Sequence, residues 1–308
     1  MNRSSEHIML QRIIFISIAL LFLFAIWAGS RSLITSDPET ITSGKNLTQE
    51  IVQPGSDASD SDASSTDTAS VSDAGSITAT DPISDSDTEY VITPQMREAL
   101  NIFWNDSVFV GDSVTLGLRN YVTKQRNNGV ECLGEAQFLA VGNMSYTNTL
   151  PEIGSRDAYH PKYQGKTVTI EEGVRLTGAK HVFILLGMND FAAYSIETGL
   201  ESCQEVVARI KELNPDVDIY IESVTPTLHN HKVFNNDNID LFNEQMKQLC
   251  AEKGWAFVNI ASVMKDENGL FKSEYCSDPE KEGVHMEAEG CVAWIDYLER
   301  FIANGGKT

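Results

Sequence analysis

The stretch FVGDSVTLGL, residues Phe109 to Leu118, joins two sequence patterns at one point. The apolar run SVFVG (107–111) has the length and composition of a short buried strand and ends on glycine. From Ser113 onward, apolar residues recur at helical spacing. One interpretation makes Ser113 the N-cap of this helix, since serine is a preferred cap. The other makes it a nucleophile held at a strand end, and the rest of the chain decides between them.

Strands and helices continue to alternate from about residue 95 to the C-terminus. Further apolar strands are predicted at 136–142, 181–187, 217–226 and 256–260. Helices are predicted at 113–125, 169–180, 201–215, 240–254 and 290–306. This alternation predicts one α/β domain over residues 95–308, built on a parallel sheet covered on both faces. In such sheets the functional site lies beyond the carboxyl ends of the strands.

Small and polar residues occupy the loops at these strand ends. The loops are Gly111-Asp112-Ser113, Gly142-Asn143, Gly187-Met188-Asn189-Asp190 and, before the last helix, Glu282-Gly283-Val284-His285. A serine, a histidine and amide donors at one sheet edge are the groups that acyl transfer requires. Ser113 would attack a carbonyl, and His285 would take its proton and return it to the leaving alcohol. The backbone N–H groups of Ser113 and Gly142, with the side-chain amide of Asn189, would hold the oxyanion.

These loops resemble the four sequence blocks of the SGNH (GDSL-type) hydrolase family. The matching strings are GDSVTLG, AVGN, LLGMND and EGVHM, in the family's order over residues 107–290. The resemblance implies a three-layer α/β/α fold with a mainly parallel, flavodoxin-like sheet, and no cofactor or metal is expected. It also implies that Ser113 is the nucleophile and first oxyanion donor, that Gly142 and Asn189 complete the oxyanion hole, and that His285 is the base.

The acid that orients the histidine departs from the family pattern. The family usually carries Asp three residues before the His, and this chain has Glu282 there. A glutamate can hold the Nδ1–H of His285, although its extra methylene needs a different backbone. Glu282 is therefore the first candidate and Asp278 the second. A Ser–His dyad supported by a backbone carbonyl is the third.

Residues 1–33 have the pattern of a targeting segment. Residues 13–29, IIFISIALLFLFAIWAG, are uncharged and almost entirely apolar, and Arg3 and Arg12 precede them. Their length approaches the roughly 20 residues of a transmembrane helix. The positive charge before the run predicts a cytoplasmic N-terminus and an exported remainder. An uncleaved single-pass anchor is the first expectation, and secretion after cleavage near Ala28 is the alternative.

Residues 34–94 are acidic and poor in large apolar side chains. They contain twelve Asp or Glu and one Lys, among many Ser, Thr and Ala. Such a segment cannot bury enough surface to offset the entropy of ordering, so a disordered linker is predicted. The formal net charge of the whole chain, −21, excludes nucleic acid as an expected partner. The five cysteines have no CxxC spacing, so the sequence shows no zinc or redox motif. One disulfide bond is possible, and the sequence does not identify its two cysteines.

Together these features predict a membrane-tethered extracellular serine esterase. It would remove a small acyl group, most simply acetyl, from a carbohydrate or another hydroxyl ester. The predicted location suggests a cell-envelope or extracellular carbohydrate as the substrate class. The same loops also fit an O-acyltransferase that acts on cell-envelope glycans. From a different class, the domain could be a catalytically inactive binding module carried on a stalk.

Overall fold

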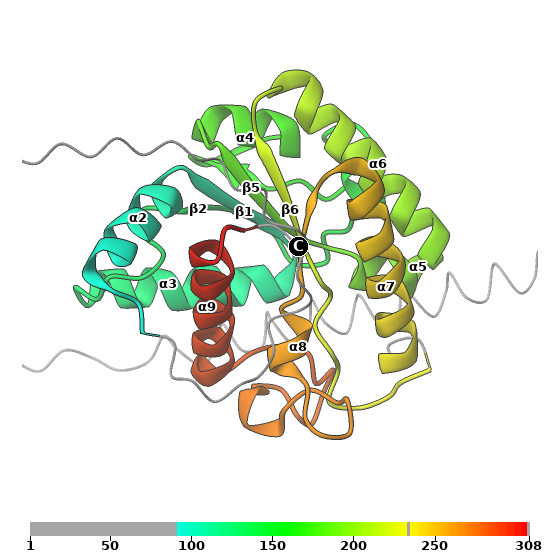
Figure 1. Cartoon of the computed structure of the whole chain (residues 1–308). Helices are drawn as coiled ribbons and strands as arrows, with labels where there is room; N and C mark the ends of the chain where they lie inside the picture. Colours follow the sequence, from blue (N-terminus) through cyan, green and yellow to red (C-terminus); the bar gives the residue numbers. More distant parts are fainter. Residues whose placement is uncertain (1–90, 233–234, 307–308) are drawn as a thin grey trace, which may run out of the picture. The chain divides into compact units, whose positions relative to one another are not determined.

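A computed structural model describes residues 91–232 and 235–306 of the 308-residue chain (Figure 1). Within these residues, five parallel strands form the central sheet in the order β2-β1-β5-β6-β7. The strands are β1 (Ser107–Gly111), β2 (Gln137–Ala140), β5 (His181–Leu185), β6 (Asp218–Glu222) and β7 (Ala256–Val258).

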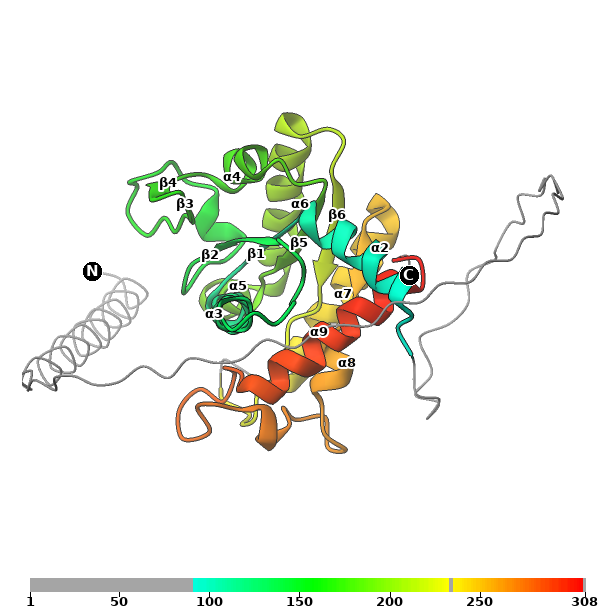
Figure 2. The same ribbon diagram turned by 90° about the vertical axis from the view of Figure 1, so that its left-hand side faces the viewer.

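Helices cover both faces of this sheet. On one face are α2 (Pro94–Asn105), α3 (Ser113–Asn127) and α9 (Ala288–Ala303), and Figure 2 shows α2 and α9 side by side. On the other face are α4 (Ile170–Thr177), α6 (Ile196–Leu213) and α7 (Asn236–Lys253). The shorter elements are α5 (Met188–Ala193), α8 (Ala261–Met264), the hairpin β3 (Lys162–Tyr163) and β4 (Lys166–Thr167), and single 3₁₀ turns at Thr147–Thr149 and Ser273–Tyr275. The expected α/β/α fold with a parallel sheet is confirmed.

Alternate residues of each strand supply the two halves of the core. In β1, Val108 and Val110 pack with α4, α6 and α7, whereas Phe109 packs with α2, α3 and α9. This division follows from the period of two along a strand, which points successive side chains to opposite faces. All five residues of β1 are buried, as expected for a central parallel strand covered on both sides.

A row of aromatic rings crosses the sheet on the face covered by α2, α3 and α9. Phe109 stacks on Phe138 of β2 at a centroid distance of 5.3 Å and on Phe183 of β5 at 4.9 Å. Phe183 stacks in turn on Tyr220 of β6 at 4.5 Å. Each stacked pair is also a directly paired position in the strand register. Cross-strand pairs of this kind stabilise a sheet beyond the area they bury.

The strand order places a crevice at the carboxyl end of β1. The chain passes from β1 to β2 on one side and then returns to β5 on the other side of β1. The loops that follow β1, β2 and β5 therefore diverge around one point, where ligands bind in open α/β sheets. This topology brings the predicted serine, glycine and asparagine loops together.

The N-terminal predictions, the anchor within residues 1–33 and most of the linker at 34–94, lie outside the described residues. Among the residues that the structure describes, no helix has the length and apolar character needed to cross a bilayer. All five cysteines fall in the described part of the chain, and each is buried and free.

One buried carboxyl group lies between the sheet and α9. Glu222, the last residue of β6, is 1 % exposed and accepts a hydrogen bond from Trp294 Nε1 at 2.7 Å. Its Oε2 has no hydrogen-bond partner within the described residues. Burial raises the pKa of Glu222 to about 8, and the bond from Trp294 offsets this only in part. The folded protein therefore holds this group in its protonated form at neutral pH.

Replacing Glu222 with Gln is expected to remove a pH-dependent loss of stability. The pKa of Glu222 in the folded protein lies above its ordinary value of 4.5. The free energy of unfolding of the wild type therefore falls as the pH rises from about 4.5 to about 8. The Gln variant should be close to the wild type in stability near pH 5 and more stable by about 4 kcal/mol near pH 9. Urea unfolding at both pH values measures this difference. An equal difference at the two pH values would contradict the assigned protonation.

Candidate active site

Ser113 opens α3 directly after β1, and the cap of that helix is its neighbour Asp112. Asp112 Oδ1 accepts a hydrogen bond from the backbone N–H of Val114 at 2.9 Å. The capping interpretation of Ser113 is therefore wrong, and its hydroxyl is available for another partner. Gly111 makes this sharp turn fit, since a Cβ there would lie 1.9 Å from Thr115 Oγ1.

His285 joins Ser113 to Asp278 through its two ring nitrogens. Ser113 Oγ and His285 Nε2 are 3.0 Å apart, and His285 Nδ1 and Asp278 Oδ2 are 2.8 Å apart. Both distances are within hydrogen-bonding range, and the order serine, histidine, carboxylate is that of an acyl-transfer triad. Ser113 and His285 are 172 positions apart in the sequence, and the fold brings them together. Asp278 and His285 are 7 positions apart, within one loop.

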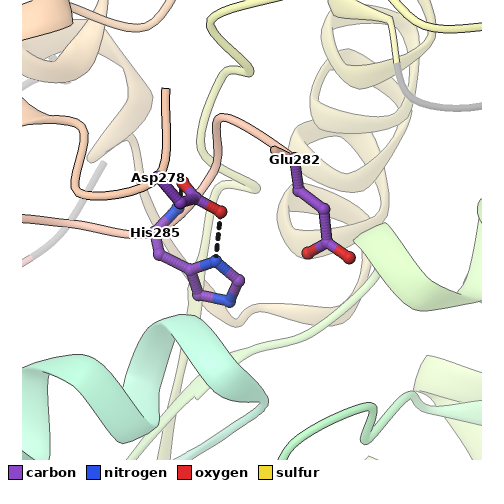
Figure 3. Close-up of side chains that lie close together, drawn as sticks. All are labelled: Asp278, Glu282 and His285. Atoms are coloured by element: carbon purple, nitrogen blue, oxygen red, sulfur yellow. Dashed lines mark hydrogen bonds and ion pairs between the residues drawn. The ribbon is translucent and has the colours of Figure 1, made fainter. Parts of the chain in front are cut away.

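The expectation that Glu282 orients His285 is corrected by this geometry. Figure 3 shows Asp278 hydrogen-bonded to the ring, with the carboxylate of Glu282 apart from that bond. The reason is the path of the loop from Asp278 to His285, which turns back on itself. Asp278 Oδ1 accepts the backbone N–H groups of Val284 and His285, each at 3.1 Å, and this leaves Oδ2 facing the ring. The second candidate, Asp278, thus occupies the position beside Nδ1.

Electrostatics keep Asp278 ionised. Its burial would raise the pKa of the carboxyl group, but the hydrogen bonds from the His285 ring and backbone outweigh that effect and lower it below its ordinary value. An ionised carboxylate beside Nδ1–H fixes the ring so that Nε2 is the acceptor that faces the serine. His285 is consequently placed to accept the proton of Ser113 Oγ.

Asn189 links the loop after β5 to the loops after β1 and β2. Its Nδ2 donates to Asp112 Oδ2 at 2.9 Å and to the carbonyl of Met144 at 3.0 Å. Both hydrogens of the amide are thereby engaged with protein acceptors. Burial raises the pKa of Asp112 to about 6, an effect that the bond from Val114 reduces. Asp112 is therefore both the cap of α3 and the anchor of the Asn189 amide.

Asp190 fixes the loop that carries Gly142. Its carboxylate accepts the backbone N–H groups of Tyr146 at 2.9 Å and Thr147 at 2.8 Å, and the hydroxyl of Thr147 at 2.7 Å. Asp190 therefore braces this loop by hydrogen bonds. Asn143, beside Gly142, has a φ of 62°, a left-handed conformation that asparagine tolerates.

A small cavity opens at these residues. Its volume is about 100 Å³, which is well below the roughly 300–1,000 Å³ of pockets for drug-sized ligands. It is lined by Asp112, Ser113, Val114, Asn143, Met188, Asn189, Glu282 and Val284. Gly142 is not among the lining residues, and its role as an oxyanion donor stays a prediction.

Asp278, Glu282 and His285 are also the residues that could hold a metal ion. One ligand atom from each lies within 4.8 Å of the others. Both nitrogens of His285 are, however, already in hydrogen bonds to Ser113 and Asp278. A metal bound through this ring would have to displace one of these bonds, so the donor set suits the triad better than a resident ion.

The family model for GDSL-like Lipase/Acylhydrolase matches residues 109–292, more than half of the 308-residue chain. The chain belongs to this family. As a GDSL-type acylhydrolase it is a carboxylic ester hydrolase, which confirms the reaction class expected from the sequence. No curated protein matches the acylhydrolase sequence.

The solved structures that are similar to this GDSL-type acylhydrolase include a lipase and an esterase. A GDSL-like lipase from Bacteroides thetaiotaomicron shares 18% identity over 65% of this chain and 87% of its own, with a TM-score of 0.45. A catalytic mutant of an acetylxylan esterase from Geobacillus stearothermophilus shares 14% identity over 65% of this chain and 93% of its own, with a TM-score of 0.44. The family assignment itself rests on the sequence match.

Proposed function

We propose that this acylhydrolase is a serine esterase that removes a small acyl group, most simply acetyl, from a hydroxyl group. The single observation that carries the proposal is the hydrogen-bonded chain from Ser113 through His285 to Asp278, with Ser113 lining a small cavity. A nucleophile, a base and an orienting carboxylate in this order support covalent catalysis through an acyl-serine.

The acylation step follows from the positions of the three side chains. Ser113 Oγ attacks the ester carbonyl carbon while its proton passes to His285 Nε2. The negative charge of Asp278 stabilises the imidazolium that forms. As the tetrahedral intermediate collapses, the bond to the alcohol oxygen breaks and that oxygen takes the proton from Nε2. The acyl group remains on Ser113.

Water completes the cycle by the same route. His285 Nε2 takes a proton from a water molecule, whose oxygen attacks the acyl carbon on Ser113. Collapse of the second intermediate returns the proton to Ser113 Oγ and releases the carboxylic acid. The enzyme is then restored for the next ester.

Three donors are proposed for the oxyanion: the N–H groups of Ser113 and Gly142, and Asn189 Nδ2. Ser113 lies in the first turn of α3, where backbone N–H groups have no partner within the helix and the helix dipole favours negative charge. Asn189 would release the Met144 carbonyl to reach the oxyanion and keep its bond to Asp112. One such donor lowers a barrier by roughly 3 kcal/mol.

The cavity at Ser113 has to take the acyl group together with the first atoms of the alcohol, so its small size supports a short acyl chain. A volume of about 100 Å³ suits a group of a few heavy atoms. Activity on p-nitrophenyl esters should therefore fall from acetate to butyrate to octanoate.

The acidic linker and apolar N-terminal run support a domain held outside the membrane, where a cell-envelope or extracellular carbohydrate would carry the ester.

The test is the direct detection of the acyl-enzyme. Full-length protein in detergent is mixed with excess p-nitrophenyl acetate and quenched with acid at short times. We expect an early burst of p-nitrophenol and an acetyl group on the peptide that carries Ser113. Hydrolysis without any acetylated peptide, or with the acetyl group on another residue, would overturn the proposed mechanism.

A further inference from the structure

Glu282 lines the active-site cavity with no salt-bridge partner in the described part of the chain. It shares the cavity wall with Ser113 and Asn189, and a carboxylate oxygen lies within 4.8 Å of a ring nitrogen of His285. Within residues 91–232 and 235–306, no Lys or Arg lies within salt-bridge distance of it. Since Asp278 holds the histidine, the charge of Glu282 is not used in the triad.

The backbone that carries Glu282 is held in place by the segment after β6. The hydroxyl of Thr227 lies between the carbonyls of His229 at 3.1 Å and Glu282 at 3.2 Å, to which its one hydrogen can donate. The N–H of Leu228 donates to the carbonyl of Gly283 at 2.8 Å. Gly283 has a φ of 66°, and a Cβ there would lie 2.9 Å from Leu228 Cβ. The side chain of Glu282 therefore starts from a fixed point beside the cavity.

The proposed mechanism determines which half of the ester lies beside Glu282. His285 Nε2 gives its proton to the leaving alcohol, so the alcohol half of the ester lies beside the histidine. Glu282 is close to the same ring. Among the described residues, the lining of the cavity includes a second carboxyl group, Asp112, and no lysine or arginine. An ester bound here thus places its alcohol group next to an uncompensated negative charge.

We propose that Glu282 is a specificity-determining residue that favours esters whose alcohol carries a positive charge, such as an ammonium group. This inference rests on the proposed esterase function. A cation on the alcohol would pair with Glu282 in the transition state, whereas an anionic alcohol would be repelled. Because Glu282 is exposed, water and salt screen its charge, and the attraction to a cation about 6 Å away corresponds to roughly a tenfold change in kcat/KM.

The test compares acetylcholine with 3,3-dimethylbutyl acetate, which has a carbon in place of the quaternary nitrogen. The ratio of their kcat/KM values isolates the charge, because the two alcohols have nearly the same shape. Release of acetic acid from each ester is measured with full-length wild-type protein, Glu282→Gln and Glu280→Gln. Glu280 is an exposed carboxylate of the same loop that does not line the cavity, which makes it the matched control.

Wild type and Glu280→Gln are expected to prefer acetylcholine by about tenfold, and Glu282→Gln to lose most of that preference. High salt should reduce the preference of the wild type and change that of Glu282→Gln little. A wild type with equal kcat/KM for both esters, or an undiminished preference in Glu282→Gln, would overturn the role of Glu282 alone. Failure of the wild type to cleave these esters and p-nitrophenyl acetate would instead overturn the esterase function.

Discussion

Ser113→Ala is expected to lower kcat for p-nitrophenyl acetate by roughly 10⁴-fold or more. The substitution removes the oxygen that lies 3.0 Å from His285 Nε2 and is proposed to carry the acyl group. The cap of α3 is unaffected, because Asp112 supplies it through its bond to Val114. The variant should therefore unfold within about 0.5 kcal/mol of the wild type. Steady-state kinetics and urea unfolding on the same preparation separate lost chemistry from lost folding.

A second serine provides the control for this experiment. Ser262 is exposed and its hydroxyl donates only to the nearby carbonyl of Asn259. Ser262→Ala should keep the wild-type rate. The same rate in Ser113→Ala as in Ser262→Ala would show that the ester is cleaved at another group, and the assignment of the nucleophile would fall.

Asp278→Asn is expected to lower kcat by about 10³-fold to 10⁴-fold. The amide oxygen can keep the bonds from the backbone N–H groups of Val284 and His285, which places the amide NH₂ against Nδ1. The ring must then accept at Nδ1 and carry its proton on Nε2. In that tautomer His285 cannot take the proton of Ser113. The variant should thus fold and bind the ester but turn it over slowly.

The matched substitution Glu282→Gln decides between the two acids. Because Glu282 makes no hydrogen bond to the ring, its loss should reduce kcat for a neutral ester far less than the loss of Asp278. Both variants are measured with p-nitrophenyl acetate under the same conditions. A larger fall in Glu282→Gln than in Asp278→Asn would mean that the loop rearranges in the working enzyme and that the spacing of the family pattern is kept after all.

Much of the fold follows from local sequence patterns. The strand predicted at residues 107–111 is β1, and the helix that starts at Ser113 is α3. Longer elements were found with shifted ends, since α6 begins at Ile196 rather than at residue 201. The short helices α5 and α8 and the twelve-residue helix α2 are not among the predicted elements. α5 consists of the residues Met188–Ala193 that look like a loop after a strand, and so few residues give no helical period to detect.

The site was less accessible to sequence reasoning, for a physical reason. Ser113, Gly142 and Asn189 each follow the end of a strand, and strand ends can be predicted from buried apolar runs. The acid depends instead on how an irregular loop turns between Asp278 and His285, and no periodicity describes such a turn. The cysteine-serine-aspartate string at residues 276–278 gave one signal, because Asp favours turns where its carboxylate accepts backbone N–H groups. The double use of Asp112, on Val114 and on Asn189, had no signal in the sequence.

The aromatic row across the sheet bears on how freely this enzyme can acquire new substrates. Phe138, Phe109, Phe183 and Tyr220 interlock four neighbouring strands at matching positions. A slip of any one strand by a single residue would turn its ring to the opposite face and break the stack. The aromatic stack therefore stabilises the register of the strands, and the register sets the position at which each catalytic loop begins. The loops themselves are left free to vary in composition without disturbing that alignment.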